Sequence, residues 1–242
     1  MTRVGSLARA EATLLRRDPL ALLSAVGVPL VFVPLVASSG MYDADKAGWM
    51  IVTLVGVSIL AGTYYNLVTA IVARREGHVL KRLRTGELRD EEILLGTAAP
   101  SVVLTWTQSL VGCGLVLALV GPTDTANVLL AATAVLLGTA VFVLLAVVTA
   151  AFTRTVELAQ VTTLPGLLVP LALSGLMIPV EHFPGWAQTV APFGPLSPVV
   201  DLLTVALTGS GGPVVGPTAV LLGWLVVGGW AARRWMRWDV RR

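Results

Sequence analysis

The amino-acid sequence predicts an all-α polytopic membrane protein with six transmembrane helices, organised as a single transmembrane domain over residues 1–242. The first observation is composition: 55% of the residues are hydrophobic, only 13% are charged, and the mean hydropathy is +0.83. Ordinary soluble domains carry about a quarter charged residues. The second observation is a series of long apolar stretches, and the third is a one-sided distribution of Lys and Arg around them.

Six apolar stretches reach the roughly 20 residues that a helix needs to cross a bilayer core of about 30 Å. None of the six cores contains Lys, Arg, Asp or Glu. The fifth stretch is interrupted by Pro165 and Pro170, so we expect it to bend. The predicted spans cover about residues 20–40, 48–73, 93–120, 126–152, 158–178 and 214–232.

The positions of the basic residues predict the orientation of these spans, because short cytoplasmic loops collect Lys and Arg. Of the 17 Lys and Arg residues, all but Lys46 fall in the N-terminal segment, the second and fourth loops or the C-terminal tail. Six spans place these four regions on the same side of the membrane. The sequence therefore predicts a multi-pass protein with both termini in the cytoplasm.

Two further segments are expected to lie at the membrane without crossing it. Residues 2–18 alternate apolar and charged residues and precede Pro19, which predicts an amphipathic helix in the inner interface. Residues 180–208 are crowded with proline and contain Asp201. A seventh span here would move the basic tail outside, so we expect short helices that enter the outer leaflet and return. Such irregular backbone is tolerated where protein or water satisfies its polar groups.

The sequence contains none of the common catalytic or cofactor-binding motifs. It has no G-x-x-x-x-G-K-[ST] loop for a nucleotide phosphate and no G-x-S-x-G nucleophile elbow. One cysteine, Cys113, and two histidines are too few for a metal cluster. We therefore expect no enzyme activity, metal or cofactor in this chain, and no nucleic-acid partner. Because the spans carry no charged residue for ion coupling, the energy for any transport should come from another subunit.

The densest charged stretch, residues 75–88 (REGHVLKRLRTGEL), follows the second predicted span. As a helix it places Val79, Leu80 and Leu83 on one stripe, with basic side chains around the rest. This pattern predicts a short amphipathic helix parallel to the inner membrane surface. The alternative is an ordinary basic loop held by anionic lipid, which explains the arginines but explains less well why Glu76, Gly77 and the Leu-x-x-Leu spacing interrupt the basic run.

With Arg75-Glu76-Gly77 and Leu80 to Arg84, this stretch resembles the cytoplasmic signature of ABC-2 type transporter permeases, particularly bacterial drug-export permeases of the daunorubicin-resistance kind. Those proteins carry an R-E-x-G-x-L-K/R-R-L-R-like segment after the second span. Here the glycine directly follows the glutamate, and Gly194 stands where the family has an asparagine before Pro195-Leu196-Ser197. The resemblance extends over the whole chain.

The resemblance implies a permease subunit of an ATP-binding-cassette exporter in the bacterial plasma membrane, which moves a drug-like, lipophilic or amphipathic compound, as in multidrug efflux and antibiotic resistance. ATP and Mg²⁺ would be bound by a separate ABC ATPase, expected in two copies, with a second permease that is identical or paralogous. Residues 75–88 would be the coupling helix. Its ATPase contacts would be Glu76, Gly77, Val79, Leu80, Lys81, Arg82, Leu83 and Arg84.

Two other functions stay open from the sequence: an ABC-2 permease for lipid-linked glycan or other envelope cargo, and a non-transporting membrane scaffold or immunity protein. Polar and aromatic residues inside the spans are the candidates for a cargo cavity, although helix–helix hydrogen bonding explains each one as well. They are Tyr64, Tyr65, Asn66, Trp106, Gln108, Gln160 and Thr163. The candidate residues of the outer segment are Glu181, His182, Pro184, Trp186, Pro195 and Asp201.

Overall fold

The fold is known from a computed structural model, which describes residues 31, 34–35, 47–77, 90–123 and 127–236. The regular structure within these ranges is helical, with no strand, as the sequence predicts. The expected interfacial helix at 2–18 and most of the expected first span at 20–40 lie outside the described residues. So does nearly all of the expected coupling helix, from residue 78 to residue 88.

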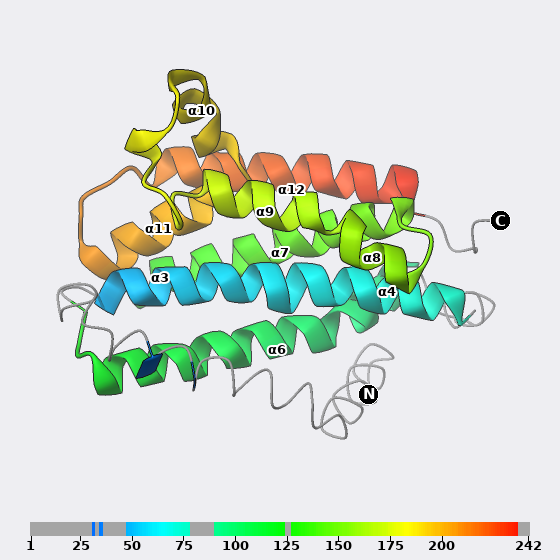
Figure 1. Cartoon of the computed structure of the whole chain (residues 1–242), viewed down its shortest axis with the longest axis horizontal. Coiled ribbons are helices and arrows are strands. Elements are labelled where there is room, and N and C mark those ends of the chain that lie inside the picture. Colours follow the sequence, from blue (N-terminus) through cyan, green and yellow to red (C-terminus); the bar gives the residue numbers. More distant parts are fainter. Residues whose placement is uncertain (1–30, 32–33, 36–46, 78–89, 124–126, 237–242) are drawn as a thin grey trace.

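Five helical segments of the described chain are long and apolar enough to cross a membrane. In Figure 1 they run side by side along the long axis of the molecule. They correspond to the second to sixth expected spans, and the count of six depends on residues 20–40. The five segments are Ala47–Glu76, Glu92–Leu119, Val128–Phe152, Val156–Leu173 and Val215–Trp235.

The second expected span lies at the centre of the described bundle. It consists of α3 (Ala47–Ser58), the π-helical segment η2 (Ile59–Tyr65) and α4 (Asn66–Glu76). Of its most apolar window 72% is buried, against 33% or less for each of the other four. It contacts α6 (Asp90–Leu119), α7 (Val128–Phe152) and α11 (Ser197–Thr208).

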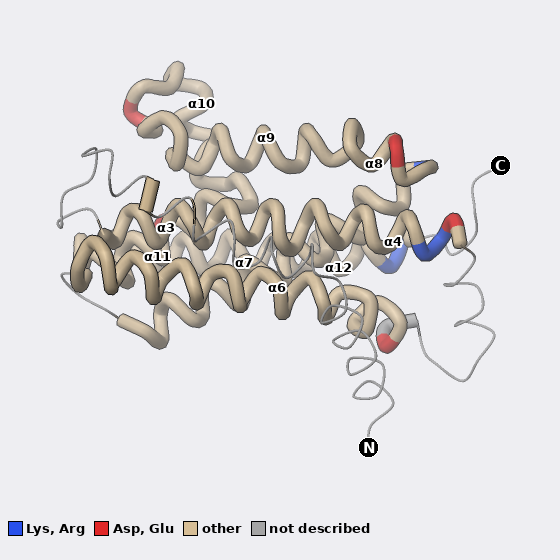
Figure 2. The backbone as a smooth tube through the Cα atoms, turned by 60° about the horizontal axis from the view of Figure 1, so that its bottom comes forward, with Lys and Arg blue, Asp and Glu red and all other residues tan. Residues whose placement is uncertain are grey.

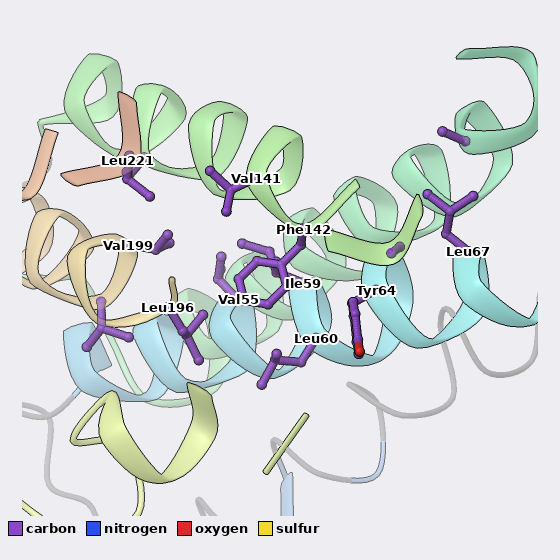
Figure 3. Close-up of a cluster of buried hydrophobic side chains, with 14 of the residues drawn as sticks. Val55, Ile59, Leu60, Tyr64, Leu67, Val141, Phe142, Leu196, Val199 and Leu221 are labelled. Carbon is purple, nitrogen blue, oxygen red and sulfur yellow. The ribbon is translucent and has the colours of Figure 1, made fainter. Parts of the chain in front are cut away.

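The hydrophobic core forms where the central span meets α7 and the helices that follow it. Figure 3 shows Ile59 and Tyr64 of η2 facing Phe142 of α7, with Leu196 and Val199 from the outer segment beside them. All of these side chains are buried. The central span is buried because it contacts helices on several sides, and its polar side chains Thr63, Tyr64 and Arg75 are hydrogen-bonded to α6 and to α7 and the turn that follows it.

The fifth expected span is divided into α8 (Val156–Thr162) and α9 (Leu164–Leu173), which meet at Thr163. Pro165 has no N–H, so it cannot donate the helical hydrogen bond to the carbonyl four residues earlier. Pro170 lies inside α9. The break therefore falls beside the first of the two prolines that predicted a bend.

Residues 180–208 form short helices that meet at a sharp angle. They are η3 (Val180–His182), α10 (Gly185–Val190), η4 (Ala191–Phe193) and α11, and the unit Gly185–Phe193 is bent by 79° from α11. Two hydrogen bonds fix this segment on its neighbours: Ser197 Oγ donates to the carbonyl of Leu173 (3.3 Å) and Trp224 Nε1 to that of Phe193 (2.9 Å). Short bent helices agree with the expected re-entrant segment, whose depth in the membrane stays a prediction.

The last span, α12 (Val215–Trp235), packs along α7 and ends with Arg233 and Arg234 in its final turn. Figure 2 shows that most charged positions of the described chain gather at one end of the bundle, where α4 ends and α6 and α8 begin. We call this region the charged end. It is the end that the sequence predicts to face the cytoplasm.

Candidate functional site

The charged end is organised around Arg75, in the last turn of α4. Its side chain is only 3% exposed, and its guanidinium donates to the carbonyl of Ala150 (2.9 Å) and to that of Thr153. Because α7 ends at Phe152, carbonyl groups in its last turn have no helical partner. A guanidinium has five N–H donors in a planar fork and suits two neighbouring carbonyls. Its positive charge is also favourable at a helix C-terminus.

Glu76 binds the other side of the same turn. Its Oε1 accepts a hydrogen bond from the backbone N–H of Val156 (3.3 Å), the first residue of α8. Thr155 caps the same helix, since its Oγ1 accepts from the N–H of Leu158 (3.2 Å). A carboxylate is favourable at a helix N-terminus, where N–H groups lack helical acceptors. Arg75 and Glu76 therefore hold the end of α7 and the start of α8 together, and we call this pair and its three backbone partners (Ala150, Thr153 and Val156) the turn clamp.

The residues beside the turn clamp extend the same set of contacts. Arg74 Nη1 donates to Thr97 Oγ1 of α6 (3.0 Å). The fully buried Thr153 is fixed by its own side chain, which donates to the carbonyl of Thr149 (2.9 Å) and is 2.8 Å from Thr162 Oγ1. The last turn of the central span is thus bonded to three other helices.

The expected ATPase-contact residues coincide only in part with the described chain. Glu76 is half-buried, and Gly77 is exposed, with its N–H bonded to the carbonyl of Ala73 (3.0 Å). Val79, Leu80, Lys81, Arg82, Leu83 and Arg84 lie outside the described residues.

The contacts of Arg75 and the intramolecular partner of Glu76 were not predicted from the sequence. A signal was available: a charged pair closes a long apolar helix, and the fourth loop carries threonines at 153 and 155 around a cap position.

The middle of the central span is bonded to its neighbours through η2. A π-helical turn shifts the following side chains relative to an α-helix and often occurs at functional sites. Thr63 Oγ1 lies 2.8 Å from Thr105 Oγ1 of α6, and Tyr64 Oη lies 3.0 Å from Thr149 Oγ1 of α7. Tyr64 is 2% exposed and meets Phe142 edge to face, with the ring centroids 6.1 Å apart. Its hydroxyl therefore joins two spans in the interior of the described chain.

The other candidate cargo residues are distributed over several helices. Tyr65 and Asn66 are half-buried, as is Gln108, whereas Gln160 is exposed. Trp106 Nε1 donates to Thr139 Oγ1 of α7 (3.3 Å). Thr163 is fully buried and donates to the carbonyl of Ala159 in its own helix (2.7 Å).

A large apolar groove lies between α6, α7 and α12, toward the charged end. Its volume is about 920 Å³, and none of the seven candidate cargo residues lines it. Gly229, Trp230 and Arg233 contribute the α12 side. Its remaining lining residues are Leu94, Leu95, Val143, Leu144, Val147, Leu225, Val226, Ala232 and Met236. Such a lining suits an aliphatic or aromatic ligand better than a sugar or an ion.

The candidate residues of the outer segment are mostly exposed. Glu181, His182, Pro184, Trp186 and Asp201 are exposed, and Pro195 is half-buried. The side-chain amide of Gln188 closes the turn before α10, because its Nε2 donates to the carbonyls of Glu181 (3.2 Å) and Phe183 (2.9 Å).

At Gly194, a Cβ would lie 3.0 Å from Ser197 Oγ and 3.2 Å from the carbonyl oxygen of Ala191. A side chain at this position therefore requires its neighbours to shift by a few tenths of an ångström.

The described residues contain no group of three or more His, Cys, Asp or Glu side chains placed to hold a metal ion. Their side-chain hydrogen bonds join neighbouring helices, cap helix ends or return to a carbonyl of the same helix.

Comparison with known protein families gives one result. A family model described as ABC-2 family transporter protein matches residues 12–234, nearly the whole chain. Among curated proteins, no sequence matches the chain. The family comprises membrane-spanning transporter components that typically work with an ABC ATPase. The match agrees with the bundle of long apolar helices and confirms the resemblance seen in the sequence: the chain belongs to the ABC-2 family of transporter proteins.

Proposed function

We propose that this chain is the membrane-spanning subunit of an ATP-driven exporter for a lipophilic or amphipathic compound of drug-like size. Two copies of an ABC ATPase bind ATP and Mg²⁺ and supply the energy, and a second permease, identical or paralogous, completes the pathway. The complex lies in the bacterial plasma membrane, with both termini of this chain in the cytoplasm. The chain itself catalyses no reaction.

The observation that supports this proposal most strongly is the place of the second span. It is the most buried span of the described chain, and the segment that resembles a coupling helix follows directly after it. An ATPase that displaces residues 75–88 therefore acts on a helix in contact with α6, α7, α8 and α11. ATP binding and hydrolysis in the partner shift the equilibrium between two arrangements of these helices.

The groove between α6, α7 and α12 supports a lipophilic cargo. Its walls are almost wholly aliphatic, and the exceptions are the aromatic side chain of Trp230 and the charged side chain of Arg233. It has space for a ligand of several hundred Å³, the usual range of small-molecule sites. A compound dissolved in the inner leaflet reaches such a groove from the side. Lipophilic cargo fits this surface better than the sugar part of a lipid-linked glycan.

The test is purification of the tagged chain from its own cells in mild detergent, followed by identification of partners present in stoichiometric amounts. We expect an ATPase with a Walker A loop, and ATP hydrolysis that rises when the true cargo is added. If the cargo that stimulates hydrolysis is a lipid-linked glycan, the envelope-export alternative replaces drug export. A partner ATPase whose activity never moves a compound in proteoliposomes favours a scaffold or immunity protein instead.

A further inference from the structure

We propose that the turn clamp makes the charged ends of the second, fourth and fifth spans move as one body, and that Arg75 and Glu76 are the residues that position them. The inference rests on the proposed function for its purpose, because it concerns how movement of α4 reaches the transport pathway. It assigns to the Arg-Glu pair a role within the chain, in place of a contact at the rim of an ATPase.

The side chains of the turn clamp bind backbone atoms of the other two helix ends. Arg75 donates to the backbone carbonyls of Ala150 and Thr153, and Glu76 accepts from the backbone N–H of Val156. Backbone atoms have no rotamers to change. A displacement of α4 is therefore passed directly to α7 and α8, because their bonded atoms cannot absorb it by a side-chain movement. Charge supports both contacts, since a cation lies at the C-terminus of α7 and an anion at the N-terminus of α8.

The arginine of the turn clamp is buried. Arg75 is only 3% exposed, so water does not reach the guanidinium to replace a hydrogen bond that it loses to a carbonyl. Removing a buried cation from its partners is costly, which disfavours gradual sliding of α4 along α7. Thr153 is fixed in turn by the carbonyl of Thr149 and by Thr162 of α8. The turn between α7 and α8 is therefore stiff where the clamp holds it.

Helix α7 forms one wall of the groove. Val143, Leu144 and Val147 line the groove, and all three lie within two helical turns of Ala150. Movement of the clamped end of α7 consequently changes the groove wall. The same helix is bonded to the central span a second time, through Tyr64 and Thr149. The clamp thus gives a continuous route of contacts from the end of α4 to the surface proposed for cargo.

The structural test measures distances between spin labels in the chain in lipid nanodiscs, with Cys113→Ala as background. One pair, Ala73→Cys and Leu158→Cys, crosses the clamp at exposed positions of α4 and α8, and a reference pair joins Leu158→Cys to Val227→Cys of α12. We expect a narrow distribution for the clamp pair that stays constant when the ATPase partner is trapped with nucleotide, while the reference pair shifts. Arg75→Gln should broaden the clamp pair. A clamp pair that shifts as much as the reference pair, or is unaffected by Arg75→Gln, overturns the inference.

The functional test compares Glu76→Ala with Glu76→Gln, because glutamine keeps an oxygen that accepts from Val156. We expect Glu76→Ala to lower the amount of cargo moved per ATP hydrolysed by roughly tenfold, a size common for coupling between sites, and Glu76→Gln to retain most of it. Both variants should still copurify with the ATPase. Loss of the ATPase from Glu76→Ala would show that Glu76 holds the partner, and the positioning role would then be wrong.

These outcomes separate this inference from the proposed function. If the unaltered chain recovers no ATPase, the exporter proposal fails. The effect of Arg75→Gln on the label distances is measured in the chain alone and still decides whether the clamp exists.

Discussion

The guanidinium of Arg75 donates to the carbonyl of Ala150 at 2.9 Å, a contact between residues 75 positions apart in the sequence. It joins the last turn of the central span to the last turn of α7, beside the carbonyl of Thr153. Positive charge after a transmembrane helix is commonly ascribed to the orientation of the chain in the membrane. Here one of the two arginines at that place is a buried structural residue.

Replacing Arg75 should destabilise the chain. Arg75→Gln leaves at least one carbonyl of the α7 terminus without its donor, at a cost of about 1–3 kcal/mol for each such group. Arg75→Lys should lower the free energy of unfolding less than Arg75→Gln does, because the ammonium keeps the positive charge. Some loss remains, because an ammonium cannot bind two carbonyls in a planar fork. The measurement is SDS-induced unfolding in mixed micelles, with Arg234→Gln as control, since Arg234 is a basic residue of the same end that is exposed. Equal unfolding midpoints for Arg75→Gln and the control would contradict the burial of the guanidinium.

A methyl group at position 166 should disturb the contact between the fifth span and η2. A Cβ on Gly166 would collide with the hydroxyl of Tyr64, so Gly166→Ala overfills the interior, with a loss of about 1–3 kcal/mol in unfolding free energy. Adding Tyr64→Phe removes the hydroxyl and should recover part of the loss. The matched control is Gly114→Ala, where a Cβ meets nothing within 4 Å. The account of this contact is wrong if both glycine variants unfold at the same SDS fraction.

The hydroxyl pair between Thr63 and Thr105 should contribute to holding η2 against α6. Thr105→Val keeps the shape but removes the partner of Thr63 at 2.8 Å, with an expected loss of about 1–3 kcal/mol because both side chains are fully buried. Thr107→Val, at an exposed position of the same helix, should leave the stability nearly unchanged. The measurement is the SDS fraction at which each variant unfolds in the same mixed micelles. A larger loss of stability for Thr107→Val than for Thr105→Val would contradict the stabilising role of the Thr63–Thr105 pair.

The sequence was sufficient to predict the helical class and the apolar spans, because both depend on local runs of residues. The described helices Val128–Phe152 and Val215–Trp235 nearly coincide with the predicted ranges 126–152 and 214–232. The division of the fifth span also has a local cause, the missing N–H of Pro165.

The sequence marks the charged pair at the end of α4 and the threonines of the fourth loop, but it does not identify the partners of that pair or the π-helical segment. The partners of Arg75 are backbone carbonyls, which every residue has, so no residue type at 150 or 153 marks them. The π-helical segment at 59–65 contains residues that occur equally in α-helices, and it is packed against α6 and α7. The groove likewise forms from three helices that are distant in sequence, and its aliphatic side chains look the same as lipid-facing ones.

Filling the groove should reduce transport without affecting assembly. Gly229 lines the groove, and a Cβ there meets no other atom within 4 Å, so Gly229→Trp adds bulk without a backbone clash. We expect transport of a lipophilic compound to fall roughly tenfold, which corresponds to about 1.4 kcal/mol of lost binding. Gly223→Trp is the control, because Gly223 is an equally open position of α12 that does not line the groove. If the two variants transport equally well and recover the same amount of ATPase, the groove does not bind the cargo.

The central claim is that this chain forms an export pathway driven by a separate ATPase. The most direct measurement is uptake of a lipophilic fluorescent compound into proteoliposomes that contain the chain and its copurified ATPase, with ATP added outside so that only inside-out complexes are driven. The account predicts accumulation that requires ATP and Mg²⁺ and is lost when the Walker A lysine of the ATPase is replaced. Hydrolysis of ATP without accumulation of any lipophilic compound, in vesicles shown to be sealed, would contradict it.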